Sequence, residues 1–250
     1  MATSGTTAFN PSIDEIIEEA YERTNVRGTR TGYQLRSARR SLNILLSEWG
    51  NRGIHLWKIK LASVPLVEGQ AEYNYANDNT NFPTDISDVL EAYVRNNTTA
   101  TAPVDTAIDK IGRSTYSALP NKLSKGTPSQ YYVQRQAYIR NTAGTITASP
   151  NIFLYTTPSS SFSGANFSVN FYYMAKLEDV GDYTNTSDTI FRFYPALISG
   201  LAYYLSIKYS PERTNDLKLL YEDELQRALD EDGEQTSTYI TPQTLYGDGV

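Results

Sequence analysis

Few side chains in this sequence could carry out acid–base or nucleophilic chemistry. The only histidine is His55, which lies among apolar neighbours and beside no recognisable nucleophile motif. A catalytic imidazole needs both a placed nucleophile and a carboxylate, so a structural role for His55 is the better interpretation. Because the sequence contains no cysteine, thiolate nucleophiles and zinc–thiolate sites are excluded.

Paired carboxylates are the second kind of group that could react, since two of them can hydrolyse a glycosidic bond. Asp14-Glu15 and Glu222-Asp223-Glu224 fall on predicted solvent-facing sides of helices, where solvated carboxylates are common. The acidic run 230–232 before Gly233 lacks the regular spacing and the final glutamate of a calcium loop. We therefore expect no catalytic residue, no metal and no cofactor. A cell-wall glycosidase using one carboxylate pair is the alternative in the enzyme class.

Charge is distributed unevenly along the chain, whose net charge is −6. The region of the first two predicted helices is basic through Arg23, Arg27, Arg30, Arg36, Arg39 and Arg40. These arginines could contact an acidic partner or DNA phosphates, or could be solvated and paired with nearby glutamates. We take Arg36, Arg39 and Arg40 as possible contacts with another subunit or with a partner. Because residues 212–234 are acidic, identical subunits could attract one another.

Helical periodicity at both ends of the chain predicts a platform of helices, which would position the carboxylates and arginines named above. Residues 191–232 predict two helices, with Pro195 near the start of the first and Ser210 as the N-cap of the second. The apolar stripe of the last helix comprises Leu217, Leu220, Tyr221, Leu225, Ala228 and Leu229. Residues 12–55 predict two further helices, which open with capping-box patterns at Ser12 and Thr31.

The expected helical core comprises Leu42, Trp49, Leu197, Gly200, Leu201 and Leu205. A glycine inside a helix costs about 1 kcal/mol relative to alanine. We therefore expect another backbone to approach Gly200 closely.

Between residues 56 and 180 the pattern changes to alternation broken by Gly, Pro, Ser and Asn clusters. This predicts about six or more short strands in a sandwich- or barrel-like sheet. The fold class is therefore α+β, a discontinuous four-helix platform with an inserted β-rich domain. The expected parts are a flexible arm 1–11, platform segments 12–55 and 188–232, the β domain 56–180, and an extended C-terminal tail 233–250.

The 20 tyrosines suit half-buried strands and wet interfaces. A carbohydrate-binding module that uses the tyrosine-rich β domain is therefore a further alternative. In the tail, Tyr239, Ile240, Leu245 and Tyr246 could anchor a segment that docks on a partner, or could be incidental residues of a floppy end. The N-terminus does not have the pattern of a signal peptide, and no apolar run is long enough to cross a bilayer, so we expect no membrane association.

Several motifs occur in a fixed order along residues 12–232. They are Leu45-Leu46-Ser47-Glu48-Trp49, His55-Leu56-Trp57, Glu68-Gly69-Gln70-Ala71-Glu72-Tyr73, Phe82-Pro83-Thr84-Asp85, Pro120-Asn121-Lys122 and Gly126-Thr127-Pro128-Ser129-Gln130-Tyr131-Tyr132. The most specific are Phe193-Tyr194-Pro195-Ala196-Leu197, Gly200-Leu201-Ala202-Tyr203-Tyr204-Leu205 and Tyr221-Glu222-Asp223-Glu224. In this order they resemble the head-to-tail adaptor (connector) proteins of short-tailed bacteriophages (podoviruses), also called tail accessory or head-completion proteins.

The resemblance implies a structural virion protein without a catalytic task, assembled in the host cytoplasm and located at the head–tail junction. It implies a homo-oligomeric ring, a dodecamer, which lies under the portal protein and extends the DNA channel. Double-stranded DNA would pass through without specific binding, and a tail nozzle or tube protein would attach below. The helical platform would build the ring, and residues 234–250 would grip the portal.

Overall fold

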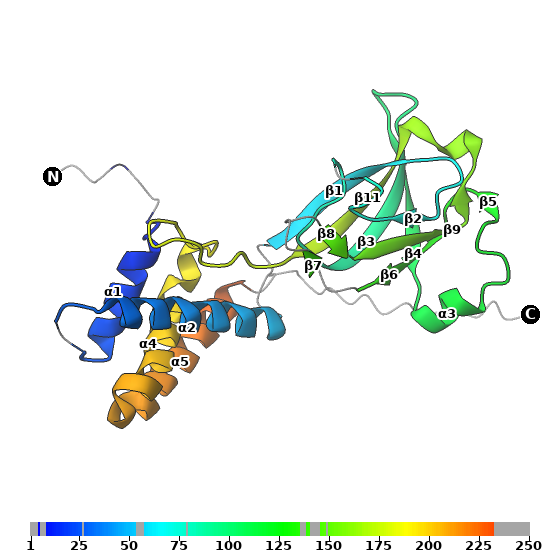
Figure 1. Cartoon of the computed structure of the whole chain (residues 1–250). Helices are drawn as coiled ribbons and strands as arrows, with labels where there is room; N and C mark the ends of the chain where they lie inside the picture. The colour runs from blue at the N-terminus through cyan, green and yellow to red at the C-terminus, as the bar shows by residue number, and fades with distance from the viewer. Residues whose placement is uncertain are drawn as a thin grey trace, which may run out of the picture. The chain divides into compact units, whose positions relative to one another are not determined.

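The computed structural model describes residues 5, 9–26, 28–53, 58–78, 80–135, 139–140, 146–148 and 150–232. Contacts between residues divide the chain into two compact units (Figure 1). The helical unit comprises Met1–Leu45 and Val180–Val250, and the β unit comprises Leu46–Asp179. The predicted α+β class is confirmed, with helices drawn from both ends of the chain and strands from its middle.

The described helices of the two chain ends are α1 (Ile13–Arg23), α2 (Gly32–Asn51), α4 (Tyr194–Tyr209) and α5 (Thr214–Asp232), with short 3-10 turns η3 (Phe191–Phe193) and η4 (Pro211–Arg213). Both predicted capping boxes form. The Glu15 backbone N–H donates to Ser12 Oγ at 3.3 Å, and the Ser12 N–H donates to Glu15 Oε2 at 2.8 Å. Thr31 and Gln34 make the same reciprocal pair at 2.8 and 3.3 Å. These contacts satisfy backbone donors that a helix start leaves free.

Helix α4 is the centre of the helical unit and packs against α1 and α5. Its buried residues lie on most of its sides, as expected of a helix surrounded by others. All the residues expected in the helical core are buried: Leu42, Trp49, Leu197, Gly200, Leu201 and Leu205.

Gly200 allows side chains of neighbouring helices to approach α4 closely. A β-carbon at position 200 would lie 2.9 Å from Leu45 Cδ2 and 2.9 Å from Tyr221 Cε2. The expected close approach therefore exists, but the neighbours are side chains of α2 and α5 rather than another backbone.

The predicted N-cap role of Ser210 is wrong. Its side chain makes no cap hydrogen bond to the turn that follows. Instead Ser210 Oγ donates to the carbonyl oxygen of Thr24 at 2.9 Å, just after the end of α1. Ser210 is buried, and its hydroxyl lies at the buried Thr24 carbonyl, which needs a donor, rather than at the backbone N–H groups that an N-cap would serve.

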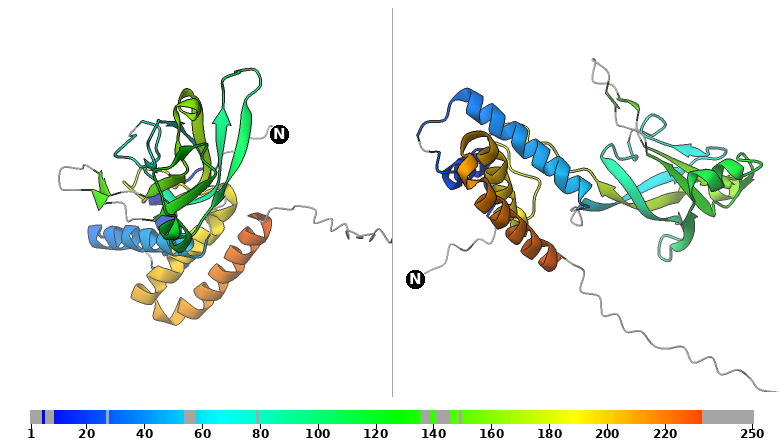
Figure 2. Two further views of the ribbon diagram at one scale, coloured as in Figure 1. Left: turned by 90° about the vertical axis from the view of Figure 1, so that its right-hand side faces the viewer. Right: turned by 90° about the horizontal axis from the view of Figure 1, so that it is seen from below.

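The β unit contains one large sheet whose strand order is β1-β11-β3-β4-β6-β9-β2. These strands are β1 (Ile59–Leu66), β2 (Glu72–Tyr73), β3 (Ile86–Asn96), β4 (Val104–Lys110), β6 (Gln130–Gln134), β9 (Asn151–Tyr155) and β11 (Gly164–Ala175). Only the β4–β6 pair is parallel among the described pairs of this sheet, which is therefore mixed. The sheet curls into a half-barrel (Figures 1 and 2).

Smaller elements complete the β unit: helix α3 (Arg113–Ala118), the 3-10 turn η2 (Ser160–Phe162), and the strand pairs β5 (Lys125–Gly126) with β10 (Thr157–Pro158) and β7 (Ile139–Arg140) with β8 (Ile146–Ala148). Alternate residues of the long strands fill the inside of the curl. Val64 of β1, Val89 of β3 and Phe171 of β11 are 0 to 1% exposed. The alternating sequence pattern therefore corresponds to one buried and one outer face.

Candidate functional site

The arginines that the sequence proposes as partner contacts fall into two groups. Arg39 is engaged within its own unit, where Nη1 donates to the carbonyl oxygen of Gly181 at 3.0 Å. Its guanidinium carbon also lies 5.3 Å from the ring centroid of Tyr183. Arg36 and Arg40 are exposed, and in the part of the chain that the structure describes neither makes a hydrogen bond or an ion pair. Arg39 thus fastens α2 to the segment after residue 180, whereas Arg36 and Arg40 are available to a partner.

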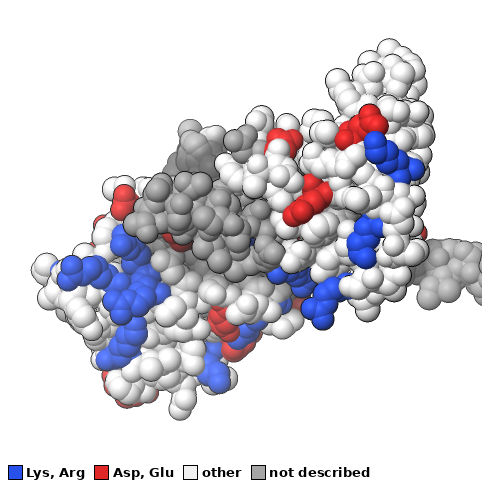
Figure 3. All heavy atoms as spheres, turned by 45° about the vertical axis from the view of Figure 1, so that its right-hand side comes forward, with Lys and Arg blue, Asp and Glu red and all other residues white. Residues whose placement is uncertain are grey.

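Arg36 and Arg40 belong to a longer exposed face of α2. Tyr33, Arg36, Arg40 and Ile44 follow one another at steps of three and four residues, so they share one side of the helix. Tyr33 is 67% exposed and Ile44 is 50% exposed. We call these residues the α2 stripe. Figure 3 shows Lys and Arg side chains gathered on the helical unit, at the left of the view.

Helix α5 presents a second exposed face, which is acidic. Asp216, Leu219, Asp223, Gln226 and Asp230 are all exposed and again repeat at steps of three and four residues. Leu219 is 71% exposed although it is the apolar member of this face. We call these residues the α5 stripe. The opposite side of α5 is buried through Leu217, Tyr221, Leu225 and Ala228.

Sequence reasoning did not single out Tyr33, Ile44 or Leu219, and it placed Leu220 on the buried side of α5. Leu220 is 40% exposed, so it lies at the edge of the buried face. A signal for the exposed apolar residues was present. Each interrupts a run of charged or polar positions at helical spacing, where burial within the subunit does not explain an apolar side chain.

A hollow of about 340 Å³ lies elsewhere on the helical unit, lined by Phe9, Pro11, Glu15, Ile16, Glu19 and Ile198. The Phe9 ring meets Tyr194 edge-on, with centroids 6.1 Å apart, and the Tyr194 hydroxyl donates to Asn10 Oδ1 at 2.7 Å. Residues 9–11, which the sequence assigned to the flexible arm, are therefore held against the start of α4. The two carboxylates that line the hollow already have partners, since Glu15 belongs to the capping box of α1 and Glu19 pairs with Arg23 at 3.0 Å.

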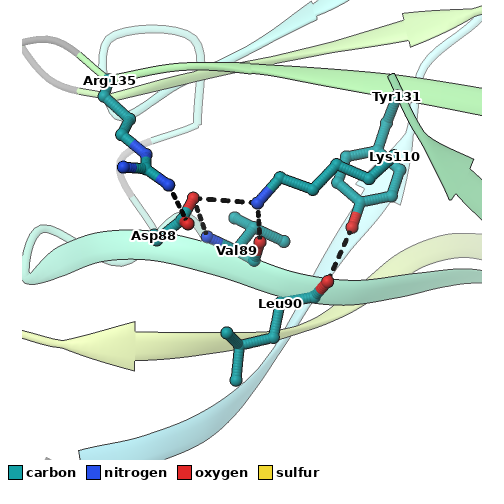
Figure 4. A network of polar contacts seen from close by, with 6 residues as sticks. All are labelled: Asp88, Val89, Leu90, Lys110, Tyr131 and Arg135. Atoms are coloured by element: carbon teal, nitrogen blue, oxygen red, sulfur yellow. Dashed lines mark hydrogen bonds and ion pairs between the residues drawn. The ribbon is translucent and has the colours of Figure 1, made fainter. Parts of the chain in front are cut away.

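The most enclosed carboxylate of the β unit is Asp88, which is 8% exposed (Figure 4). Its Oδ1 accepts from Lys110 Nζ at 3.1 Å and from the Val89 N–H at 2.9 Å, and Arg135 pairs with Oδ2. Beside this network the Tyr131 hydroxyl donates to the Leu90 carbonyl oxygen at 3.1 Å. Burial, together with the charge of Asp88, raises the pKa of Tyr131 to about 12. Both carboxylate oxygens of Asp88 are occupied, so the network joins β3, β4 and β6 rather than offering a free acid.

The aromatic side chains on the β unit bear on the carbohydrate-binding alternative. Tyr116 of α3 stacks on Tyr132 of β6 with centroids 5.2 Å apart, and Tyr132 stacks on Phe153 of β9 at 5.9 Å. Lys122 Nζ lies 5.5 Å from the Tyr116 centroid. Sugar recognition by stacking needs a free ring face, whereas these rings lie against one another. The cluster thus supports the packing of α3 on the sheet.

The carboxylate pairs considered for hydrolysis have structural contacts. Glu15 belongs to the capping box of α1. Asp223 pairs with Arg227 at 2.6 Å, and Glu224 lies 3.6 Å from Arg23 Nη1. No three His, Cys, Asp or Glu side chains gather as a metal site would require among the residues that the structure describes. Nor does any described helix combine the length and apolar character that crossing a bilayer demands.

Several of the sequence-based predictions fall on residues outside the described parts. They concern Arg27, His55, most of the arm 1–11 and the tail 233–250 with its proposed anchors Tyr239, Ile240, Leu245 and Tyr246.

A family model described as SU10 adaptor protein matches residues 10–245, which span the helices, the β unit and most of the C-terminal tail. Among curated proteins, the comparison finds no relative.

Proposed function

The chain belongs to the SU10 adaptor protein family, and we propose from this that it forms a ring under the portal protein at the head–tail junction of a short-tailed phage. The family is one of structural phage adaptors, so the protein is a virion component that connects portal and tail. We further propose that the ring is a dodecamer assembled in the host cytoplasm. It would extend the DNA channel toward a tail nozzle or tube protein and conduct the genome at ejection without binding DNA specifically.

The observation that carries this proposal is the extent of the family match. It covers residues 10–245 and therefore includes the helical unit, the β unit and the tail as far as Leu245. A match confined to a few helices would leave the β unit and the tail unexplained. The tail thus belongs to the family's pattern, which supports a shared role for Tyr239, Ile240 and Leu245 in docking on the portal.

The surfaces of the helical unit support ring formation. Identical subunits close into a ring when two different patches of one copy meet those of its neighbours and the rotation closes. The α2 and α5 stripes are two such patches, both exposed and of opposite charge. The net charge of −6 also suits a channel protein, since DNA is not retained by an acidic wall.

The proposal is tested by mixing the purified protein with purified portal rings and imaging the mixture by electron microscopy. We expect an added ring of density on one face of the portal, with a copy number that matches the portal symmetry. A protein that leaves the portal bare over a wide concentration range would contradict the proposed function. A peptidoglycan-hydrolysing activity that His55→Ala or Glu222→Gln abolishes would favour the glycosidase instead.

A further inference from the structure

We propose that the α2 stripe of one copy packs against the α5 stripe of a second copy, and that this contact repeats around the ring. The inference rests on the proposed function, because it names the surfaces through which the ring would close. It commits to one occupant for both stripes, a second copy of this chain.

Charge complementarity is the first argument. Arg36 and Arg40 are exposed cations without partners among the described residues. Asp216 is an exposed carboxylate that likewise has no partner among them. Asp223, the other carboxylate near the middle of the α5 stripe, has only an exposed contact with Arg227 on its own helix. Opposite charges on facing patches steer association and fix the register of a contact.

The apolar residues of the stripes are the second argument. Leu219 lies between Asp216 and Asp223 along α5, and it is 71% exposed. Arg36 and Arg40 are one helical turn apart, about 6 Å, so a leucine can pack between their aliphatic stems while each guanidinium reaches a carboxylate. Tyr33 and Ile44 flank the arginines and would cover the contact from water.

Within one copy both stripes stay uncovered, which leaves each of them free to contact a second copy. Both stripes are exposed within a single helical unit, so they do not cover each other there. A contact between two different patches is heterologous, and it generates rings or filaments rather than closed dimers. A DNA backbone would be the competing partner of the arginines, and the Tyr33 hydroxyl can also donate to phosphate, but the exposed Ile44 side chain has no group that binds phosphate.

Charge-swap variants test the contact directly. Arg36→Glu with Arg40→Glu makes both stripes acidic, and Asp216→Arg with Asp223→Arg makes both basic. Each double variant alone places like charges in every contact, so we expect its assembly on portal rings to fall by at least about tenfold. In an equal mixture the two double variants can alternate around the ring, and every contact between unlike copies then joins opposite charges. We expect this mixture to assemble to within about twofold of the wild type.

Lys218→Glu is the matched control, because Lys218 is exposed on α5 but off the stripe. It should assemble like the wild type. Thermal melting of every variant checks that the fold is retained.

If wild-type protein binds portal and both double variants assemble as well as it does, the stripe contact is overturned while the proposed function stands. If wild-type protein itself fails to bind portal, the proposed function fails. If Arg36→Glu with Arg40→Glu instead abolishes salt-dependent DNA binding and the mixture does not restore assembly, the stripe binds DNA and the inference is wrong.

Crosslinking provides a second measurement that does not depend on altered charges. The sequence has no cysteine, so Ile44→Cys with Leu219→Cys introduces the only two thiols. With a short bismaleimide linker, copies assembled on portal should yield a ladder of covalent multimers, because each copy is joined to two neighbours. The control pair Ile44→Cys with Lys218→Cys should give no ladder. Absence of multimers from the first pair in intact assemblies would overturn the proposed contact.

Discussion

A β-carbon added to Gly200 of α4 would lie 2.9 Å from Cε2 of Tyr221 of α5, closer than carbon atoms approach without displacement. The third participant is Leu45 of α2, at the same 2.9 Å from its Cδ2. Tyr221 and Leu45 are at most 1% exposed, so neither can move into solvent. Side chains of α2 and α5, from the two ends of the chain, therefore meet α4 at this glycine.

The first prediction concerns Gly200→Ala. Alanine favours the helix by about 1 kcal/mol, but overpacking a core costs typically about 1–3 kcal/mol. We expect a net loss of about 1 kcal/mol in the free energy of unfolding, and a clearly larger loss for Gly200→Val. The matched control is Gly50→Ala in α2, where an added β-carbon meets nothing within 4 Å. Urea unfolding of the three variants measures the difference. Equal stability of Gly200→Ala and Gly50→Ala would contradict the close approach.

The second prediction compares two leucines. Leu201 is 0% exposed and Leu219 is 71% exposed. Leu201→Asp buries a carboxylate without a partner, which costs several kcal/mol, so we expect loss of folding. Leu219→Asp should leave the circular dichroism spectrum and the melting temperature nearly unchanged. A folded Leu201→Asp variant with native melting behaviour would show that this side of α4 is not core.

The third prediction concerns the Asp88 network of the β unit. Asp88→Asn leaves Lys110 and Arg135 facing each other without the carboxylate between them. We expect a loss of about 2 kcal/mol in the stability of the β unit, because charged groups lose a buried partner. Glu68→Gln is the control, since it breaks an exposed pair with Lys125. Exposed pairs contribute about 1 kcal/mol or less. Chemical denaturation followed by tryptophan and tyrosine fluorescence distinguishes the two variants, and equal losses would argue against a structural role for Asp88.

The fourth prediction is an alkaline instability of the β unit. Burial raises the pKa of Tyr73 and of Tyr131 to about 12, above the ordinary value of 10.0. The folded state therefore favours the protonated tyrosines, and its stability is complete below pH 10.0 and declines as the pH rises toward about 12. The loss is on the order of 2 kcal/mol for each tyrosine.

Tyr131→Phe tests this sign. The variant loses the hydrogen bond to the Leu90 carbonyl oxygen and should be less stable than wild type at neutral pH by about 1 kcal/mol. Because phenylalanine does not ionise, the deficit should shrink between pH 10.0 and about 12. Melting temperatures across this range are the measurement. A stability deficit of Tyr131→Phe that grows with pH would show that ionisation of Tyr131 does not destabilise the folded state.

The fifth prediction concerns the C-terminal tail and rests on its sequence and on the family match. Shortening the chain after Gly233 removes Tyr239, Ile240, Leu245 and Tyr246. We expect the melting temperature to stay nearly unchanged and co-sedimentation with portal to be lost. Several arms on one ring act together, so weak single contacts give a strong attachment. Undiminished binding would place the portal contact elsewhere, and a large drop in melting temperature would mean that the tail packs on its own subunit.

Local chemistry made part of this fold predictable. The capping boxes at Ser12 and Thr31 form because both partners are only three residues apart. The strands follow an alternating pattern that any half-buried strand must have. The apolar stripe of α4 was predictable as well, because its helical spacing identified Leu197, Leu201 and Leu205. The family resemblance likewise depended on the order of short motifs, which the sequence displays directly.

Tertiary structure decided what those residues contact. Arg36, Arg39 and Arg40 are equivalent in the sequence, yet only Arg39 meets the Gly181 carbonyl, 142 residues away along the chain. Ser210 has the sequence of an N-cap, but its hydroxyl donates instead to the carbonyl oxygen of Thr24, 186 residues away along the chain. The sequence alone therefore determined the elements and the family, because periodicity and caps act between near neighbours. Which side chains are paired and which are left for a partner was decided by packing, because that brings together groups that are distant in sequence.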